Sequence, residues 1–375
     1  METHQQLLKI LEALNRVSRG LRPSQDSPDS DSSAIKALHE LRTASGSILY
    51  GDPLLVSLSQ RISQLADSVQ DLHNTKPPQG LISFVTRRVR SHEVSRLAAE
   101  IESELDALID RETVSNLTKN LAGIRCNVQP SVYPSDDDQL FDQMSVLQER
   151  LSRGFDIDLQ DLLLKSGIFT ELEWALCNPL FSKRVREKAA ISMKELVLFN
   201  KDVFVGSILI GGSVKALISM GSLCSLQVLS SLIKAIKSPL VDEMESCGGI
   251  LKIVGHLSSE DMETRAMAME CVMEIGYFGR KEAVESMING GLIKRLVELQ
   301  RAEVGGGSGR EMKGFHPFGN CVARFAVQLE VGEGLRQREK RVFKQQILSK
   351  VREACDVSDA ESATIVAQVL WGSSP

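Results

Sequence analysis

The stretch Gly248-Gly249-Ile250-Leu251-Lys252-Ile253-Val254 has a close copy 42 residues later, Gly290-Gly291-Leu292-Ile293-Lys294-Arg295-Leu296-Val297. In both copies, glycine precedes a short run with apolar residues at helical spacing. The same phrase follows Gly167 and Gly212, so glycines at 167, 212, 249 and 291 mark steps of 45, 37 and 42 residues. A period of about 40 residues with helical patterning predicts an α-solenoid, in which helical repeats stack on one another.

A longer helical pattern follows each glycine phrase in a shared phase. Ala189 is followed by Glu195-Leu196, and Ala268 stands in the same relation to Glu274-Ile275. A weaker copy covers residues 226–236, with Ala235-Ile236 at the matching position. Small residues at these positions allow neighbouring helices to approach closely, as stacking requires. The pattern therefore predicts one long helix per repeat.

A fourth long helix is expected from about residue 320 to residue 331, after the Gly-Gly-Gly-Ser-Gly stretch at 305–309. Matching positions then lie at 195, 235, 274 and 330, in steps of 40, 39 and 56. We assign the excess in the last step to a flexible glycine-rich insertion near 303–319. Two further helical segments, 335–354 and 360–370, are expected to complete and cap the solenoid.

Composition supports an all-α protein inside the cell. Aromatic residues make up only 5% of the chain, so helix-on-helix packing is favoured over a sheet. The net charge of −5 argues against nucleic acid as a partner. The seven cysteines are scattered and never form a Cys-x-x-Cys pair, which indicates buried thiols in a reducing compartment. No signal peptide and no membrane-spanning run is apparent, so we expect a cytoplasmic or nuclear location.

The chain divides into three predicted parts. Amphipathic helical segments at 3–19, 34–49, 52–72 and 81–121 predict an N-terminal helical bundle over residues 1–123. An acidic linker is expected at 124–141, and the solenoid at 142–375. The bundle offers a second docking face, which could serve self-association.

The two central repeats resemble the armadillo repeat. The residues that carry the likeness are Gly249-Ile250-Leu251, Glu263-Thr264-Arg265-Ala266 through Glu274-Ile275, and Met287-Ile288-Asn289-Gly290-Gly291-Leu292. The likeness extends over about residues 142–370. It implies an armadillo-type superhelix after a helical N-terminal domain, a layout similar to plant armadillo proteins related to the U-box ligases. The U-box motif itself is missing, so ligase activity is not implied.

Armadillo proteins bind extended peptides along a groove lined by their third helices, and the resemblance therefore implies a groove here. In the distantly similar importin-α, a Trp and an Asn four residues later recur on those helices. Neither occurs at the matching pairs Ile191/Glu195, Ser231/Ala235, Glu270/Glu274 and Ala326/Glu330. Trp174 and Asn178 have the spacing, but they are expected on a second helix.

The candidate partner-binding residues follow from these positions. They are Lys188, Ile191, Glu195, Met267, Glu270, Glu274 and Glu330 in the groove, with Phe315, His316 and Phe318 in the loop. The glutamates would form an acidic rail suited to a basic peptide, or they are solvated charges. The loop aromatics are either an exposed contact site or an anchor on the last repeat. The basic residues 336–344 and Arg87-Arg88-Val89-Arg90 would bind an anionic partner, or they form an ordinary helix surface.

We find no catalytic, metal or cofactor motif. The six histidines are dispersed, and residues 305–309 lack the Lys-Ser/Thr of a nucleotide-binding loop. The sequence thus predicts a non-enzymatic scaffold or adaptor that binds proteins through the groove. Two alternatives stay open, namely a substrate-recruiting component of a ubiquitin-ligase assembly and a peripheral membrane adaptor.

Overall fold

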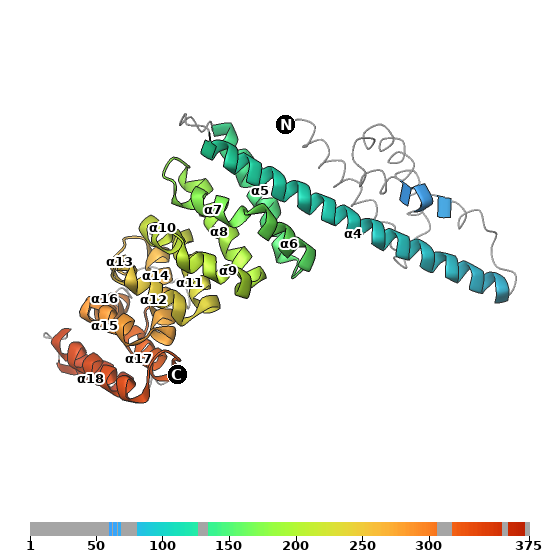
Figure 1. Cartoon of the computed structure of the whole chain (residues 1–375). Helices are drawn as coiled ribbons and strands as arrows, with labels where there is room; N and C mark the ends of the chain where they lie inside the picture. Colours follow the sequence, from blue (N-terminus) through green and yellow to red (C-terminus); the bar gives the residue numbers. More distant parts are fainter. Residues whose placement is uncertain are drawn as a thin grey trace. The chain divides into compact units, whose positions relative to one another are not determined.

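The computed structural model describes residues 60–61, 63–65, 67–68, 81–126, 134–305, 317–354 and 359–371, and every element in these ranges is an α-helix (Figure 1). The helices are α4 (Leu81–Cys126), α5 (Pro134–Ser152), α6 (Ile157–Ser166), α7 (Ile168–Cys177), α8 (Lys183–Phe199), α9 (Lys201–Ile210), α10 (Ser213–Met220), α11 (Leu223–Ile236), α12 (Ser238–Ser246), α13 (Gly249–His256), α14 (Met262–Phe278), α15 (Lys281–Asn289), α16 (Leu292–Gly305), α17 (Cys321–Val331), α18 (Gln337–Ala354) and α19 (Asp359–Trp371). The predicted all-α class is confirmed.

The chain forms two compact units. The first comprises residues 1–119 and 156–166, and the second comprises 120–155 and 167–375. In the first unit, Leu105 and Leu117 of α4 are fully buried, and Arg61 pairs with Glu104 at 3.1 Å. Most of the three earlier segments of the predicted bundle lie outside the described residues, so the bundle stays a prediction.

The described ends of the expected linker at 124–141 are helical. Helix α4 is one continuous helix of 46 residues that ends only at Cys126, and α5 begins at Pro134. Proline suits the first turn of a helix, and acidic residues there complement the helix dipole. The Pro-Ser-Asp-Asp-Asp stretch is therefore a helix start, and the prediction of a linker over 134–141 is wrong.

Three consecutive repeats in the second unit each contain three helices. In α9–α10–α11 and α12–α13–α14, the first two helices have 8 to 10 residues and the third has 14 or 17. Helices α15, α16 and α17 form the third set. Gly167, Gly248 and Gly291 directly precede second helices and have φ of 67°, 66° and 84°, a conformation that favours glycine. The glycine phrases thus mark the starts of second helices, as predicted.

The third helices stack in sequence, as the colours from green to orange show in Figure 1. Helix α5 contacts α8, α8 contacts α11, α11 contacts α14, α14 contacts α17, and α17 contacts α19. Small side chains such as Ala189 and Ala268 are completely buried in this stack. At the C-terminal end, α18 packs on the second helix α16 while α19 packs on the third helix α17. The last two helices therefore extend the row of second helices and the row of third helices. This agrees with the armadillo-type solenoid that the sequence predicts.

The cysteines only partly match the prediction of buried thiols. Cys271 and Cys321 are buried, and burial raises the pKa of each thiol to about 12. Cys126 and Cys177 are exposed, so the prediction is wrong for these two.

Within the described ranges, no single helix has the length and apolar character needed to cross a membrane. Only α9 and α10 taken together reach these limits, and the pair is bent by 71° at its break.

Candidate functional site

Capping side chains fix the starts of three third helices, α8, α11 and α14. The oxygen atoms of Ser182, Ser222 and Asp261 accept hydrogen bonds from the backbone N–H groups three residues later, and so cap α8, α11 and α14. These caps are 40 and 39 residues apart, the same steps that separate positions 195, 235 and 274. Equal distances from the cap place matching positions on the same face of the three helices.

This face carries the predicted groove positions of α8, α11 and α14. We call their six side chains the ladder surface. All six are half-buried, and they are Ile191, Glu195, Ser231, Ala235, Glu270 and Glu274. Side chains in the stack next to them, such as Ser192, Leu232 and Cys271, are buried. The repeat spacing therefore brings residues about 40 positions apart into one continuous row.

We call the pair of matching positions on one third helix a rung. The fourth rung, on α17, differs from the prediction. Ala326 is buried with an exposed fraction of 6%, so it faces the core, while Arg324 is exposed and Gln328 is half-buried. The positions that match 270 and 274 are therefore 324 and 328, two residues before the predicted Ala326/Glu330 pair. Helix α17 also begins differently from the other third helices, because Asn320 adopts a left-handed φ of 52° and makes no side-chain cap.

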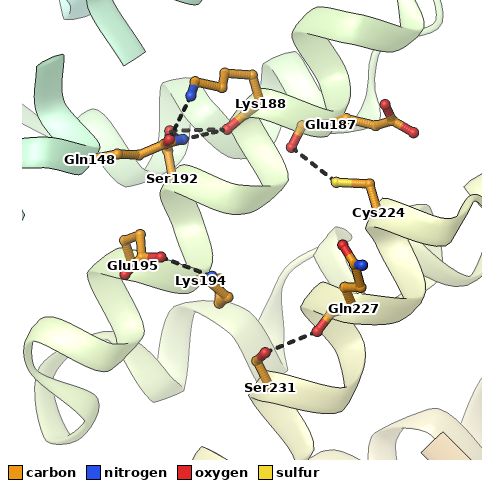
Figure 2. A network of polar contacts seen from close by, with 9 residues as sticks. All are labelled: Gln148, Glu187, Lys188, Ser192, Lys194, Glu195, Cys224, Gln227 and Ser231. Carbon is orange, nitrogen blue, oxygen red and sulfur yellow. Dashed lines mark hydrogen bonds and ion pairs between the residues drawn. The ribbon is translucent and has the colours of Figure 1, made fainter. Parts of the chain in front are cut away.

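Lysines neutralise most of the predicted acidic rail. Lys194 pairs with Glu195 at 2.8 Å between Nζ and Oε1 (Figure 2). Lys234 of α11 hydrogen-bonds Glu270 of α14 and lies 3.7 Å from Glu274. With two lysines facing three glutamates, one negative charge remains. The surface is therefore nearly neutral.

The electrostatics around Lys234 show competing effects. The hydrogen bond to Glu270 raises the pKa of Lys234. Burial raises the pKa of Glu274, although nearby Lys234 acts in the opposite direction. Glu274 is thus a partly desolvated carboxylate that Lys234 helps to keep ionised.

Lys188 serves the packing of α5 on α8. Its Nζ donates to Gln148 Oε1 at 2.6 Å and lies 4.7 Å from the centre of the Phe141 ring. Gln148 in turn donates to the backbone carbonyl of Lys188 and to the buried Ser192 hydroxyl, as Figure 2 shows. Burial lowers the pKa of Lys188. Of the other groove candidates, Met267 is half-buried at the start of α14.

Glu330 lies away from the ladder surface, at the contact between α17 and α18. Its carboxylate pairs with Lys344 at 3.0 Å, and its backbone carbonyl accepts from Lys340. A pocket of about 240 Å³ lies beside it, lined by residues of both helices. The prediction that Glu330 lines the groove is wrong, because it extended the repeat spacing across an insertion of uncertain phase.

Of the three loop candidates, the structure describes Phe318. Phe318 is buried, and the guanidinium carbon of Arg265 lies 5.8 Å from the centre of its ring. Phe318 therefore anchors this segment on the repeats, one of the two predicted alternatives. Phe315 and His316 lie outside the described residues. Trp174 lies on α7, a second helix as expected, and contacts Phe181 edge-on at 5.2 Å between ring centres.

Within the ranges that the structure describes, no group of three or more His, Cys, Asp or Glu side chains is arranged to hold a metal ion. His256 packs beside Gly221, and burial lowers the pKa of its imidazole.

The chain matches no family model and none of the curated proteins. It is similar to solved structures of designed armadillo repeat proteins. One is 12% identical with a TM-score of 0.46, over 68% of this chain and 99% of that one. Another, designed for modular peptide recognition, is 13% identical with a TM-score of 0.47, over 70% and 100%. A third, solved with the peptide (KR)4, is 13% identical with a TM-score of 0.47, over 69% and 98%. Likenesses at these identities concern the fold alone.

Proposed function

We propose that this chain is a non-enzymatic protein-interaction scaffold whose ladder surface binds an extended segment of a partner protein. One observation carries the proposal: half-buried side chains from α8, α11 and α14 stand in register along one row. Packed helices lie about 8–10 Å apart, and an extended chain advances about 3.3 Å per residue. Each rung therefore matches two to three residues of such a segment.

The charges of the ladder surface define the partner further. Because Lys194 and Lys234 already pair with the glutamates, a strongly basic peptide would have to displace both lysines. The single remaining negative charge favours one Lys or Arg in the bound segment, beside Glu270 and Glu274. Ile191 and Ala235 offer apolar contacts to its other side chains.

The test uses peptides selected on the full chain from a displayed random library. Their affinities are then measured by fluorescence anisotropy against Ser231→Arg, which places a bulky side chain on the middle rung. Among the described residues, the Ser231 hydroxyl donates only to the carbonyl of Gln227 in its own helix, so the fold should tolerate the change. We expect binding to weaken about tenfold or more.

Ser219→Arg is the matched control, because Ser219 is exposed on the second helix α10 of the same repeat. It should bind within about twofold of wild type. If every selected peptide binds both variants as well as the wild type, the ladder surface is not the binding site.

Narrower roles remain proposals with their own tests. Recruitment of substrates to a ubiquitin ligase would show as partner-dependent ubiquitin transfer in a reconstituted assay. Self-association through the N-terminal segments would show as a dimer mass in light scattering. A cytoplasmic or nuclear location would be seen by microscopy of the tagged chain.

A further inference from the structure

Helix α18 and the residue before it form a strongly positive surface on an acidic chain. Residues 336–353 contain seven Lys or Arg and two Glu, a net charge of +5, whereas the whole chain has −5. Arg336, Arg338 and Arg341 are exposed and make no ion pair within the described residues. These guanidinium groups are therefore available to an anionic ligand.

The pocket between α17 and α18 lies in this positive surface. Ala326, Leu329 and Ile347 provide an apolar wall, and Gln337, Arg341 and Lys344 line its polar side. Leu329 and Ile347 are buried, so the wall is continuous with the core. A pocket of about 240 Å³ has room for one bulky aliphatic side chain.

Two lysines hold the polar side of the pocket in place. Lys340 Nζ donates to the carbonyls of Glu330 and Gly332, both at 2.8 Å, and so satisfies the C-terminal end of α17. Lys344 pairs with the Glu330 carboxylate at 3.0 Å. Glu330 thus occupies a cation that a ligand carboxylate could otherwise bind, while Arg341 has no such partner among the residues that the structure describes.

We propose that this pocket binds a short acidic segment of a partner protein. A leucine-like side chain of the segment enters the pocket, and its flanking carboxylates bind Arg341 and Lys344. A planar guanidinium can hold a carboxylate through two parallel hydrogen bonds. Because the pocket has an apolar wall beside a basic side, it selects a segment that carries an aliphatic side chain next to carboxylates. A membrane surface would use the charges but would leave this pocket empty.

The probes are fluorescein-labelled nine-residue peptides with a central Leu, Ile or Phe between Asp and Glu residues, titrated against the full chain. Arg341→Glu should weaken binding about tenfold or more because attraction becomes repulsion. Glu330→Gln should strengthen it about twofold to fivefold, since it releases Lys344 and removes a competing carboxylate. Replacing the central Leu of the peptide by Ser should weaken binding about tenfold.

Lys252→Glu is the control for charge, because Lys252 is exposed on the second helix α13 and the change in charge equals that of Arg341→Glu. It should bind within about twofold of wild type. Ser231→Arg should also leave these peptides bound, which separates this site from the ladder surface. Circular dichroism confirms that each variant is folded, and the gain in Glu330→Gln cannot arise from misfolding.

Three results would overturn the proposal. One is the absence of binding by every acidic peptide at protein concentrations up to about 1 mM. Another is equal binding by wild type and Arg341→Glu. The third is binding of vesicles rich in phosphatidylserine, lost in Arg341→Glu, when the peptides do not bind; the positive surface would then be a membrane site.

Discussion

The centre of the solenoid and its C-terminal end differ in how far their exposed charges are paired. In the centre, Lys194 and Lys234 pair with glutamates of the same or the next third helix. At the end, Arg338 and Arg341 of α18 have no acidic partner within the described residues. Paired charges leave the central surface nearly neutral and hold neighbouring helices in register. The unpaired guanidinium groups are available to the acidic segment proposed above.

The contact between α14 and α17 joins these two regions, and Phe325→Ala should break it. Phe325 is fully buried, and its ring lies so close to Gly276 that a Cβ there would be 3.0 Å away. We expect the free energy of unfolding to fall by about 3–5 kcal/mol, because a cavity replaces the ring. Guanidinium denaturation measures the loss. Since each repeat is stabilised by its neighbours, binding of acidic peptides at α17–α18 should also weaken.

Val327→Ala on the same helix is the control. Val327 has an exposed fraction of 44%, so its truncation should cost less than about 0.5 kcal/mol. Equal losses for the two variants would show that Phe325 does not link the centre to the end.

The turn after α17 is the second link between the regions. The N–H groups of Glu333 and Gly334 donate to the Tyr277 carbonyl at 2.8 and 3.2 Å. A Cβ on Gly334 would overlap the Gly279 carbonyl, so Gly334→Ala should lower the free energy of unfolding by about 1–3 kcal/mol. Thermal and urea denaturation measure this.

Gly206 is the contrasting glycine, because it lies inside α9 with open space at its Cβ position. Gly206→Ala should raise the free energy of unfolding by about 0.5–1 kcal/mol.

The centre was predictable from sequence because its signals are local. Glycine steps such as Gly248-Gly249 mark the second helices, and caps such as Ser222 and Asp261 repeat at the same interval as the rungs. The acidic rail was predicted without its lysines. The pair Lys234–Glu270 joins residues 36 apart, so only the stacked helices reveal it.

The end was less predictable because the insertion hides its phase. The repeat spacing across the insertion near 303–319 predicts Ala326 in the groove, whereas its burial places it in the core. The basic character of α18 was visible in the sequence. The pocket was not, since it needs Leu329 of α17 and Ile347 of α18 to meet.

Removing the cation that pairs the central rungs should expose a pH dependence. Burial raises the pKa of Glu274 above its ordinary value of 4.5, while Lys234 counteracts this shift. A carboxyl with a raised folded pKa binds its proton more tightly in the folded state, so the free energy of unfolding decreases as pH rises through that window. In Lys234→Met, the Glu274 pKa rises further and the decrease continues to higher pH.

The deficit of Lys234→Met relative to wild type should therefore grow from about pH 4.5 toward neutral pH, where we expect about 0.5–1 kcal/mol. Urea denaturation across this range measures it. Adding Glu274→Gln to Lys234→Met should flatten the slope. A deficit that is constant with pH would assign the loss to packing of the lysine stem.

The smallest expected changes in the free energy of unfolding come from removing one positive charge in each region. Lys194→Gln should lower the free energy of unfolding by about 0.2–0.5 kcal/mol, because Lys194 pairs with Glu195. Arg341→Gln should raise it by about 0.2–0.5 kcal/mol at low salt, because Arg341 lies three residues from both Arg338 and Lys344 on α18. Urea denaturation at low salt and at 1 M salt measures both.

Stability changes of opposite sign at low salt that both approach zero at 1 M salt would show that the two effects are electrostatic. At 1 M salt the Debye length is only about 3 Å, so interactions between exposed charges are screened. A loss of stability in Arg341→Gln would instead mean that this guanidinium supports the fold, and the comparison between centre and end would fail. If removing Arg341 stabilises the protein while weakening its hold on acidic peptides, the positive end lowers stability in exchange for binding. That trade-off is expected of a ligand site and has no purpose in a solenoid cap.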